Sequence, residues 1–217
     1  MSSDYILSFD PALINMAYCL VSIETLKISK WGIFSIKDST NEGTCKKLSH
    51  FLGEKKLTDG INVIIIHEQQ PRCNIKTITI CGQLQMYFVL EKNKQESNAE
   101  STGVIEKIVG YHAKHKINYY QPMPDDEPMP LERLDKLKKG HYRTKQIVIE
   151  HCRRILKQNE DFEWLSWFEK QPKLDDLGDS FVQSLSYIKT NKLGPFKNKY
   201  SFTNFKKRIW ISKCHLI

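Results

Sequence analysis

The stretch Tyr5-Ile-Leu-Ser-Phe-Asp10 predicts a buried β-strand that ends on a carboxylate. Its residues are mostly apolar or favour strands, and Pro11 closes the run. A carboxylate beside an apolar core must be paired or must bind a metal. The ordinary alternative is that Asp10 only opens the turn before a second strand. The rest of the chain decides between these two interpretations.

Three further segments extend a sheet around this strand. Residues 16–23 and 27–36 are apolar or alternating and follow after short turns, so with the first strand they predict an antiparallel meander. Residues 61–68 form a nearly continuous apolar run that ends on Glu68. This pattern is typical of a central strand covered on both faces. It is the second strand that ends on an acid.

Helical spacing of apolar residues predicts helices within residues 44–52, 74–91, 104–109, 141–156 and 175–188, with Asp175 as the cap of the last. Residues 117–121 predict a short fifth strand. Residues 92–101, 122–140 and the Trp-rich residues 164–168 predict links or loops. This order predicts an α/β fold in which helices flank a five-stranded mixed sheet. We expect one domain over residues 1–190 and a tail over residues 191–217.

Composition restricts the class of protein. The chain has 217 residues and 40% hydrophobic residues, enough for one large globular domain. No window approaches the roughly 18 uncharged apolar residues of a membrane span, and the chain starts almost directly in its first strand without a secretory leader. We therefore expect an intracellular protein without a membrane partner. Six scattered cysteines without a Cys-x-x-Cys pair predict reduced thiols rather than a zinc site.

The net charge of +8 is concentrated at the C-terminal end. After Asp179 the chain has eight lysines and arginines and no acidic residue. Aromatic residues lie between these cations, a mixture suited to phosphate contacts and base stacking. The alternative is a solvated basic terminus whose aromatic residues pack against the domain.

Four carboxylates are candidates for a metal site. Asp10 and Glu68 end strands that should be adjacent, and Asp176 and Asp179 lie three residues apart in a predicted helix. Clustered carboxylates repel one another unless a cation neutralises them, and oxygen ligands suit Mg²⁺ or Mn²⁺. Two such ions support phosphodiester hydrolysis. Alternatively, the helical pair are only favourable acids at a helix N-terminus.

Three motifs carry a resemblance to a known family. Leu7-Ser-Phe-Asp10-Pro-Ala-Leu-Ile-Asn15, His67-Glu68-Gln-Gln-Pro71-Arg72 and Lys173-Leu-Asp-Asp176-Leu-Gly-Asp179-Ser-Phe resemble, in order and spacing, motifs of the RuvC-type Holliday junction resolvases. The mitochondrial and poxvirus-like branches are the most similar. Tyr142-Arg-Thr-Lys145 is similar to a basic segment with a functional lysine in the poxvirus enzymes. The similarity spans about residues 5–188.

The resemblance implies an RNase H-like fold and a homodimer that resolves four-way DNA junctions with paired symmetric nicks. It implies two Mg²⁺ held by the four acids, with Mn²⁺ as a substitute, and a charge-neutralising role for Lys145. The DNA-binding residues we expect are Arg72, Arg133, Lys136, Lys138, Lys139, Arg143, Lys206, Lys207 and Arg208. A viral protein of this kind would act in the host-cell cytoplasm, and a cellular one in the nucleus or mitochondrion.

One departure from the family pattern is Ala12, where a glycine is usual; it removes no ligand. Two other functions remain open at this stage. One is another RNase H-like nuclease that cuts flaps or RNA–DNA hybrids. The other is a junction-binding protein without catalysis, which would bind DNA without needing a metal.

Overall fold

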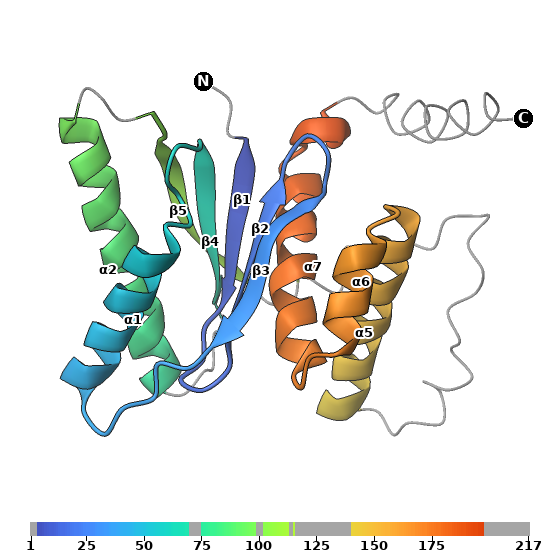
Figure 1. Cartoon of the computed structure of the whole chain (residues 1–217), viewed down its shortest axis with the longest axis horizontal. Helices are drawn as coiled ribbons and strands as arrows, with labels where there is room; N and C mark the ends of the chain where they lie inside the picture. The colour runs from blue at the N-terminus through green and yellow to red at the C-terminus, as the bar shows by residue number, and fades with distance from the viewer. Residues whose placement is uncertain (1–3, 70–74, 99–101, 113–114, 116–139, 198–217) are drawn as a thin grey trace, which may run out of the picture.

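The computed structural model describes residues 4–69, 75–98, 102–112, 115 and 140–197. A five-stranded mixed sheet separates two groups of helices: α1 and α2 cover one face, and α5, α6 and α7 cover the other (Figure 1). The elements are β1 Tyr5–Asp10, β2 Met16–Ser22, β3 Ile28–Phe34, α1 Asn41–Lys55, β4 Val63–Gln69, α2 Ile75–Ser97, β5 Ile105–His112, α5 His141–Gln158, α6 Phe162–Glu169, α7 Leu174–Thr190 and the 3₁₀ turn Gly194–Phe196.

The strand order is β3-β2-β1-β4-β5. β1, β2 and β3 pair antiparallel in sequence, which confirms the predicted meander. β4 pairs parallel to both β1 and β5, which confirms it as a central strand. The register places Phe9 beside His67. Because parallel strands end at the same edge of a sheet, Asp10 and Glu68 lie side by side at the ends of β1 and β4.

The pleat of the strands decides which face each acid takes. Side chains alternate between the two faces along a strand. Ile6 lies in the core under α7, and Ser8 hydrogen-bonds to α7, so Asp10 also lies on the α7 face. Ile64 and Ile66 belong to the same core, which places Glu68 on that face too. Both carboxylates therefore lie on the side of the sheet that α7 covers.

The helix α7 has the apolar stripe that the sequence predicts. Leu177, Phe181, Leu185 and Ile188 are fully buried, and on α5 the predicted inward face of Val148, Cys152 and Ile155 is buried as well. The prediction that Asp175 caps α7 is wrong. The N-cap position belongs to Lys173, and Asp175 lies in the first turn, where its carboxylate contacts a lysine of α5.

The predicted link over residues 164–168 is in fact part of the helix α6. Its aromatic side chains surround Trp31 of β3: Phe168 stacks on the Trp31 ring with 5.1 Å between centroids, Trp164 packs edge-on, and Trp167 packs at a tilt. The Trp31 indole donates to the carbonyl of Leu177 at 3.1 Å. Trp164, Trp167 and Phe168 are three and four residues apart, which places them on one side of α6, where they face Trp31.

The predicted boundary between α2 and a polar link at residue 92 is also wrong, since α2 continues to Ser97. Lysine, glutamine and glutamate are good helix formers. Lys92 also pairs with Glu96 at 3.9 Å, and Gln95 accepts a hydrogen bond from the backbone of Ile105 at 2.9 Å. The polar segment is therefore a helical turn that supports the next strand.

The predicted helix over residues 104–109 is instead the strand β5. The apolar residues there have spacing that suits a helix, but they are β-branched and pair with β4. As an edge strand, β5 buries its side chains irregularly, so period-two alternation is weak. The strand predicted over residues 117–121 and nearly all of the loop predicted over residues 122–140 lie outside the described residues. In the described part, no helix combines the length and apolar character that crossing a membrane requires.

Candidate active site

Three carboxylates meet at the edge of the sheet where β1 and β4 end. Asp10, Glu68 and Asp179 each offer an oxygen, and these oxygens all lie within 4.8 Å of one another. Glu68 is buried, with 5% of its surface exposed, and the other two are half-buried. The structure thus brings together residues that lie up to 169 positions apart in the sequence.

The helix α7 contributes Asp179 because its N-terminal end lies at this edge of the sheet (Figure 1). One turn further along α7, the side-chain amide of Gln183 donates to Ser8 Oγ at 2.8 Å and to the Phe9 carbonyl at 3.2 Å. Gln183 is fully buried. It fixes α7 against the last residues of β1, immediately before Asp10. The sequence alone carries no signal for Gln183, because its role depends on which strand the helix contacts.

The three carboxylates of Asp10, Glu68 and Asp179 are suitable ligands for a hard divalent cation. Three carboxylates within 4.8 Å, one of them buried, repel one another when ionised. A bound cation removes that repulsion, and oxygen ligands are those that Mg²⁺ and Mn²⁺ prefer. The site is consistent with metal binding through Asp10, Glu68 and Asp179.

Asp176 lies one turn before Asp179 on α7 and is not a member of this three-carboxylate group. Burial, and next the charge of Asp175, raise the pKa of Asp176 to about 6. Its ionised form is therefore disfavoured in the folded chain when no cation is bound. The side chain lines a cleft together with Lys145 and Lys173.

A first prediction concerns stability. When folding raises the pKa of a carboxyl group, folding is favoured most at a pH below the pKa of that group in the unfolded chain. For Asp176 this stability is lost as the pH rises through about 6, its pKa in the folded chain. We expect Asp176→Asn, in EDTA, to raise the stability at pH 8 by about 1 kcal/mol, a value discounted because the side chain is only partly buried. The gain should vanish as the pH falls toward 4. Thermal melts at the two pH values measure it.

Asp175→Asn is the control for this prediction, because the sign is opposite. Burial alone would raise the pKa of Asp175, but the hydrogen bond and charge of Lys145 outweigh burial and lower it. Asp175→Asn should therefore be less stable than the wild type at pH 8. A destabilised Asp176→Asn protein at pH 8 would contradict the assignment of a raised pKa.

The cleft beside the carboxylates has a volume of about 380 Å³. The turn between β1 and β2, the first residues of α2, and the N-terminal parts of α5 and α7 form its walls. Three lysines from three elements reach it, Lys76, Lys145 and Lys173. Ala12 lies in its wall, so the departure from the family's glycine falls at the cleft and leaves the acids in place. Lys76 was not among the residues that the sequence predicts for the site.

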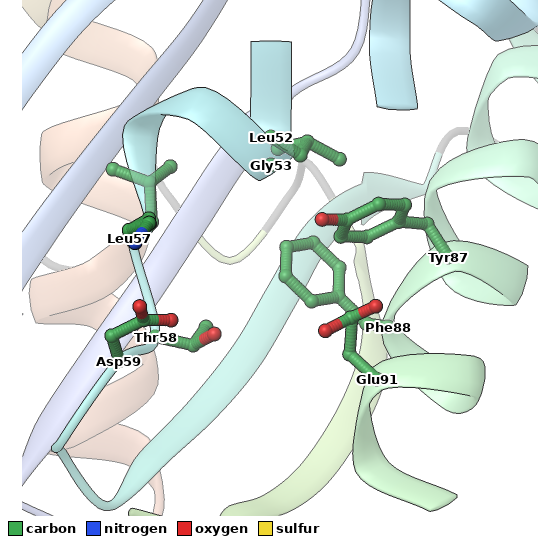
Figure 2. Close-up of a pocket in the computed structure, with 9 residues that line it drawn as sticks. Leu52, Gly53, Leu57, Thr58, Asp59, Tyr87, Phe88 and Glu91 are labelled. Atoms are coloured by element: carbon green, nitrogen blue, oxygen red, sulfur yellow. The ribbon is translucent and has the colours of Figure 1, made fainter. Parts of the chain in front are cut away.

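Figure 2 shows a second hollow, of about 160 Å³. Tyr87, Phe88 and Glu91 of α2 reach it, and Leu57 and Asp59 lie opposite on the segment after α1. That segment leads into Val63 at the start of β4, whereas Glu68 lies near its end, about 17 Å further along the strand. The second hollow therefore does not belong to the candidate active site.

The structure describes one of the expected DNA-binding residues, Arg143, which is half-buried in the first turn of α5. The others lie outside the described residues: Arg72, Arg133, Lys136, Lys138, Lys139, Lys206, Lys207 and Arg208. Their roles stay predictions.

No protein-family model matches the sequence, and no curated protein matches it either. The sheet order, the helices on both faces and the acids at the ends of β1 and β4 define an RNase H-like fold. Among solved structures, the chain is similar to the yeast mitochondrial Holliday junction resolvase Ydc2. The TM-score is 0.52 at 15% identity, over 84% of this chain and 78% of that chain. This confirms the predicted fold.

A second similar structure is T. thermophilus RuvC in complex with a Holliday junction substrate. Its TM-score is 0.41 at 9% identity, over 88% of this chain and 98% of that chain.

Proposed function

We propose that the chain is a structure-selective endodeoxyribonuclease that resolves four-way DNA junctions with paired symmetric nicks. The observation that carries this proposal is the group formed by Asp10 and Glu68, at the ends of adjacent parallel strands, and Asp179 of α7. The chain shares its fold with a mitochondrial Holliday junction resolvase. The adjoining cleft with three lysines suits an anionic backbone.

The proposed roles follow from position. Asp10, Glu68 and Asp179 hold Mg²⁺, and Asp176 joins them when the cation is bound. Two Mg²⁺ ions would neutralise charge on the phosphate and stabilise the attacking and leaving oxygens. Lys145 places a positive charge at the cleft beside Asp176, where it offsets negative charge that develops on the phosphate. Lys76 and Lys173 contact flanking phosphates.

The test is a cleavage assay on four labelled substrates: a four-way junction, a duplex, a flap and an RNA–DNA hybrid, each with and without Mg²⁺. Metal-dependent, symmetric nicks confined to the junction are the expected result. Cutting of flaps or hybrids in preference to the junction would favour another RNase H-like nuclease. Tight junction binding without cutting, under any metal, would favour a non-catalytic binding protein.

We also propose a homodimer, since a junction offers two equivalent strands for paired cuts. One face of α2 supports it. Ile75, Ile78, Met86 and Leu90 are between 52% and 82% exposed, and together with Gly82 they form one stripe at helical spacing. A Cβ atom added at Gly82 would meet nothing within 4 Å, so a second helix can approach closely there.

A second prediction tests this stripe. Met86→Glu should convert a dimer into a monomer in sedimentation experiments, because it places a charge in the centre of an apolar contact. Its melting should show an intact fold, since Met86 is 59% exposed. Ser49→Glu, an equal charge change on exposed α1, should remain dimeric. A wild-type protein that is monomeric both free and on junction DNA would refute the dimer.

The division into a domain over residues 1–190 and a tail over residues 191–217 remains a proposal. Leu193 and Phe196 pack against the core under α7. Residues 198–217 lie outside the described part of the chain.

A third prediction concerns the tail. Changing Lys206, Lys207 and Arg208 to glutamate should weaken binding to junction and duplex alike. It should flatten the slope of log affinity against log salt by about 0.9 per lost phosphate contact. Changing the same residues to glutamine should have a smaller effect of the same sign. An unchanged slope, in a protein whose melting curve shows that it is folded, would show the tail to be a solvated terminus.

A further inference from the structure

An ion pair joins α5 to α7 at the edge of the cleft. The Lys145 ammonium donates to Asp175 Oδ2 in a close contact. The Asp175 side chain is 15% exposed and that of Lys145 is 35% exposed. A pair shielded in this way holds its geometry better than a surface pair, whose long side chains sample many conformations.

The packing of the two helices fixes this pair. Gly178 of α7 lies against α5, where an added Cβ would come within 3.1 Å of Val148 Cγ1 and 3.8 Å of Cys152 Cβ. The absence of a side chain at Gly178 therefore lets the helices approach. Three residues earlier on each helix stand Lys145 and Asp175. Since residues three apart lie on the same side of a helix, the close approach at Gly178 brings these two side chains together.

The ion pair between Lys145 and Asp175 lies next to the acids of the candidate active site. Asp175 lies directly before Asp176, and Asp176 and Lys145 line the same cleft. The charges of Asp176 and Asp179 also attract the Lys145 ammonium. Without Asp175, the flexible lysine would be drawn toward the acids that are needed for a cation. With Asp175, the ammonium stays on the cleft wall.

We propose that Asp175 is a positioning residue that holds the Lys145 ammonium at the cleft wall, facing the bound phosphate and away from Asp10, Glu68 and Asp179. The inference rests on the proposed nuclease function. Asp175 acts through Lys145 and is not itself a ligand of the cation.

The test is a double-mutant cycle on single-turnover cutting of the junction. Asp175→Asn should slow cutting by about 10²-fold, the size expected when a catalytic group is misplaced by about 1 Å. Junction affinity in Ca²⁺ and the Mg²⁺ concentration for half-maximal rate should stay within about twofold, since no phosphate contact or ligand is lost. In a Lys145→Gln background, Asp175→Asn should cause no further loss. Asp175→Glu should restore part of the rate.

The matched control is Glu169→Gln. Glu169 accepts two hydrogen bonds from Arg153, at 2.6 and 2.9 Å, in another ion pair of α5 that lies two turns from Lys145. Breaking this pair should lower the melting temperature and leave cutting unchanged. If Asp175→Asn does not fold, Asp175→Ser and Asp175→Glu take its place in the cycle.

A readout without metal or DNA accompanies the kinetics. The rate at which acetic anhydride modifies Lys145, followed by peptide mass spectrometry, should rise several-fold in Asp175→Asn because the amine is no longer held by a carboxylate. Lys46, exposed on α1, serves as the internal reference.

Four results would overturn the inference while leaving the nuclease function standing. They are unchanged Lys145 reactivity, unchanged or faster cutting by Asp175→Asn, an additive loss in the Lys145→Gln background, or a raised Mg²⁺ requirement, which would make Asp175 a ligand. Failure of the wild-type protein to cut any of the four substrates would instead overturn the proposed function, and with it this role.

Discussion

Asp10→Asn should lower the rate of metal-dependent junction cutting by about 10³-fold or more, beyond the 10–100-fold typical of residues that only support a metal ligand. Asp179→Asn should have the same effect. Asparagine keeps the volume of the side chain but lacks its charge, and two carboxylates within 4.8 Å cannot replace the third. Junction binding in Ca²⁺ or EDTA should change little, because the substitution leaves the lysines of the cleft in place.

A second measurement separates loss of metal binding from loss of catalysis. Mn²⁺ should raise the melting temperature of the wild-type protein, since a ligand that binds the folded state stabilises it by mass action. The rise should be much smaller in Asp10→Asn. Glu54→Gln, which removes an exposed acid of α1, should retain both the rise and the cutting. Near-normal cutting by Asp10→Asn would refute the assignment of the metal site.

The sequence was sufficient to predict that Asp10 and Glu68 come together, whereas the predicted fourth acid, Asp176, is not in the three-carboxylate group. Two apolar runs that each end on a carboxylate, Tyr5–Asp10 and the run ending at Glu68, indicate central strands of one sheet from their local pattern alone. The apolar stripe on α7 does not predict the place of Asp179, because this residue lies about 200° round the helix from Leu177, on the side where Gln183 contacts β1. Its place beside Asp10 followed from the resemblance to the resolvase motifs.

The strand β5 shows where local pattern fails. Val104, Ile105, Ile108 and Val109 have spacing that fits one face of a helix, but pairing with β4 decides their conformation. Such pairing is a long-range interaction that a short window of sequence does not contain. The edge position contributes to the error, because only part of the strand is buried and the pattern carries little information.

The supporting residues of the site could not be predicted for a related reason. The contact between Asp175 and Lys145 depends on how closely α5 approaches α7 at Gly178. The sequence marks Asp175 equally well as a helix cap, which is what we predicted. Polar residues on a helix can contact several neighbours, and the packing of the helices selects one.

Gln183 is the second residue of this kind, and its replacement should have a large effect. We expect Gln183→Met to slow junction cutting by about 10²-fold, the scale for a reacting group displaced by about 1 Å. Methionine has a similar length and volume, so the buried site remains filled. What is lost is the amide that donates to Ser8 Oγ and the Phe9 carbonyl, immediately before Asp10.

The same substitution should lower the free energy of unfolding by about 1–3 kcal/mol, because these buried acceptors lose a donor. That loss alone would leave the folded enzyme active, so the rate is measured well below the melting temperature. Ser184→Ala is the matched control: Ser184 is equally buried on α7, but its hydroxyl donates within the helix to Ser180, at 3.2 Å. It should lose stability without losing rate. If Gln183→Met and Ser184→Ala cut at equal rates, the alignment of Asp10 with Asp179 does not depend on the link between α7 and β1, and sheet packing alone maintains the site.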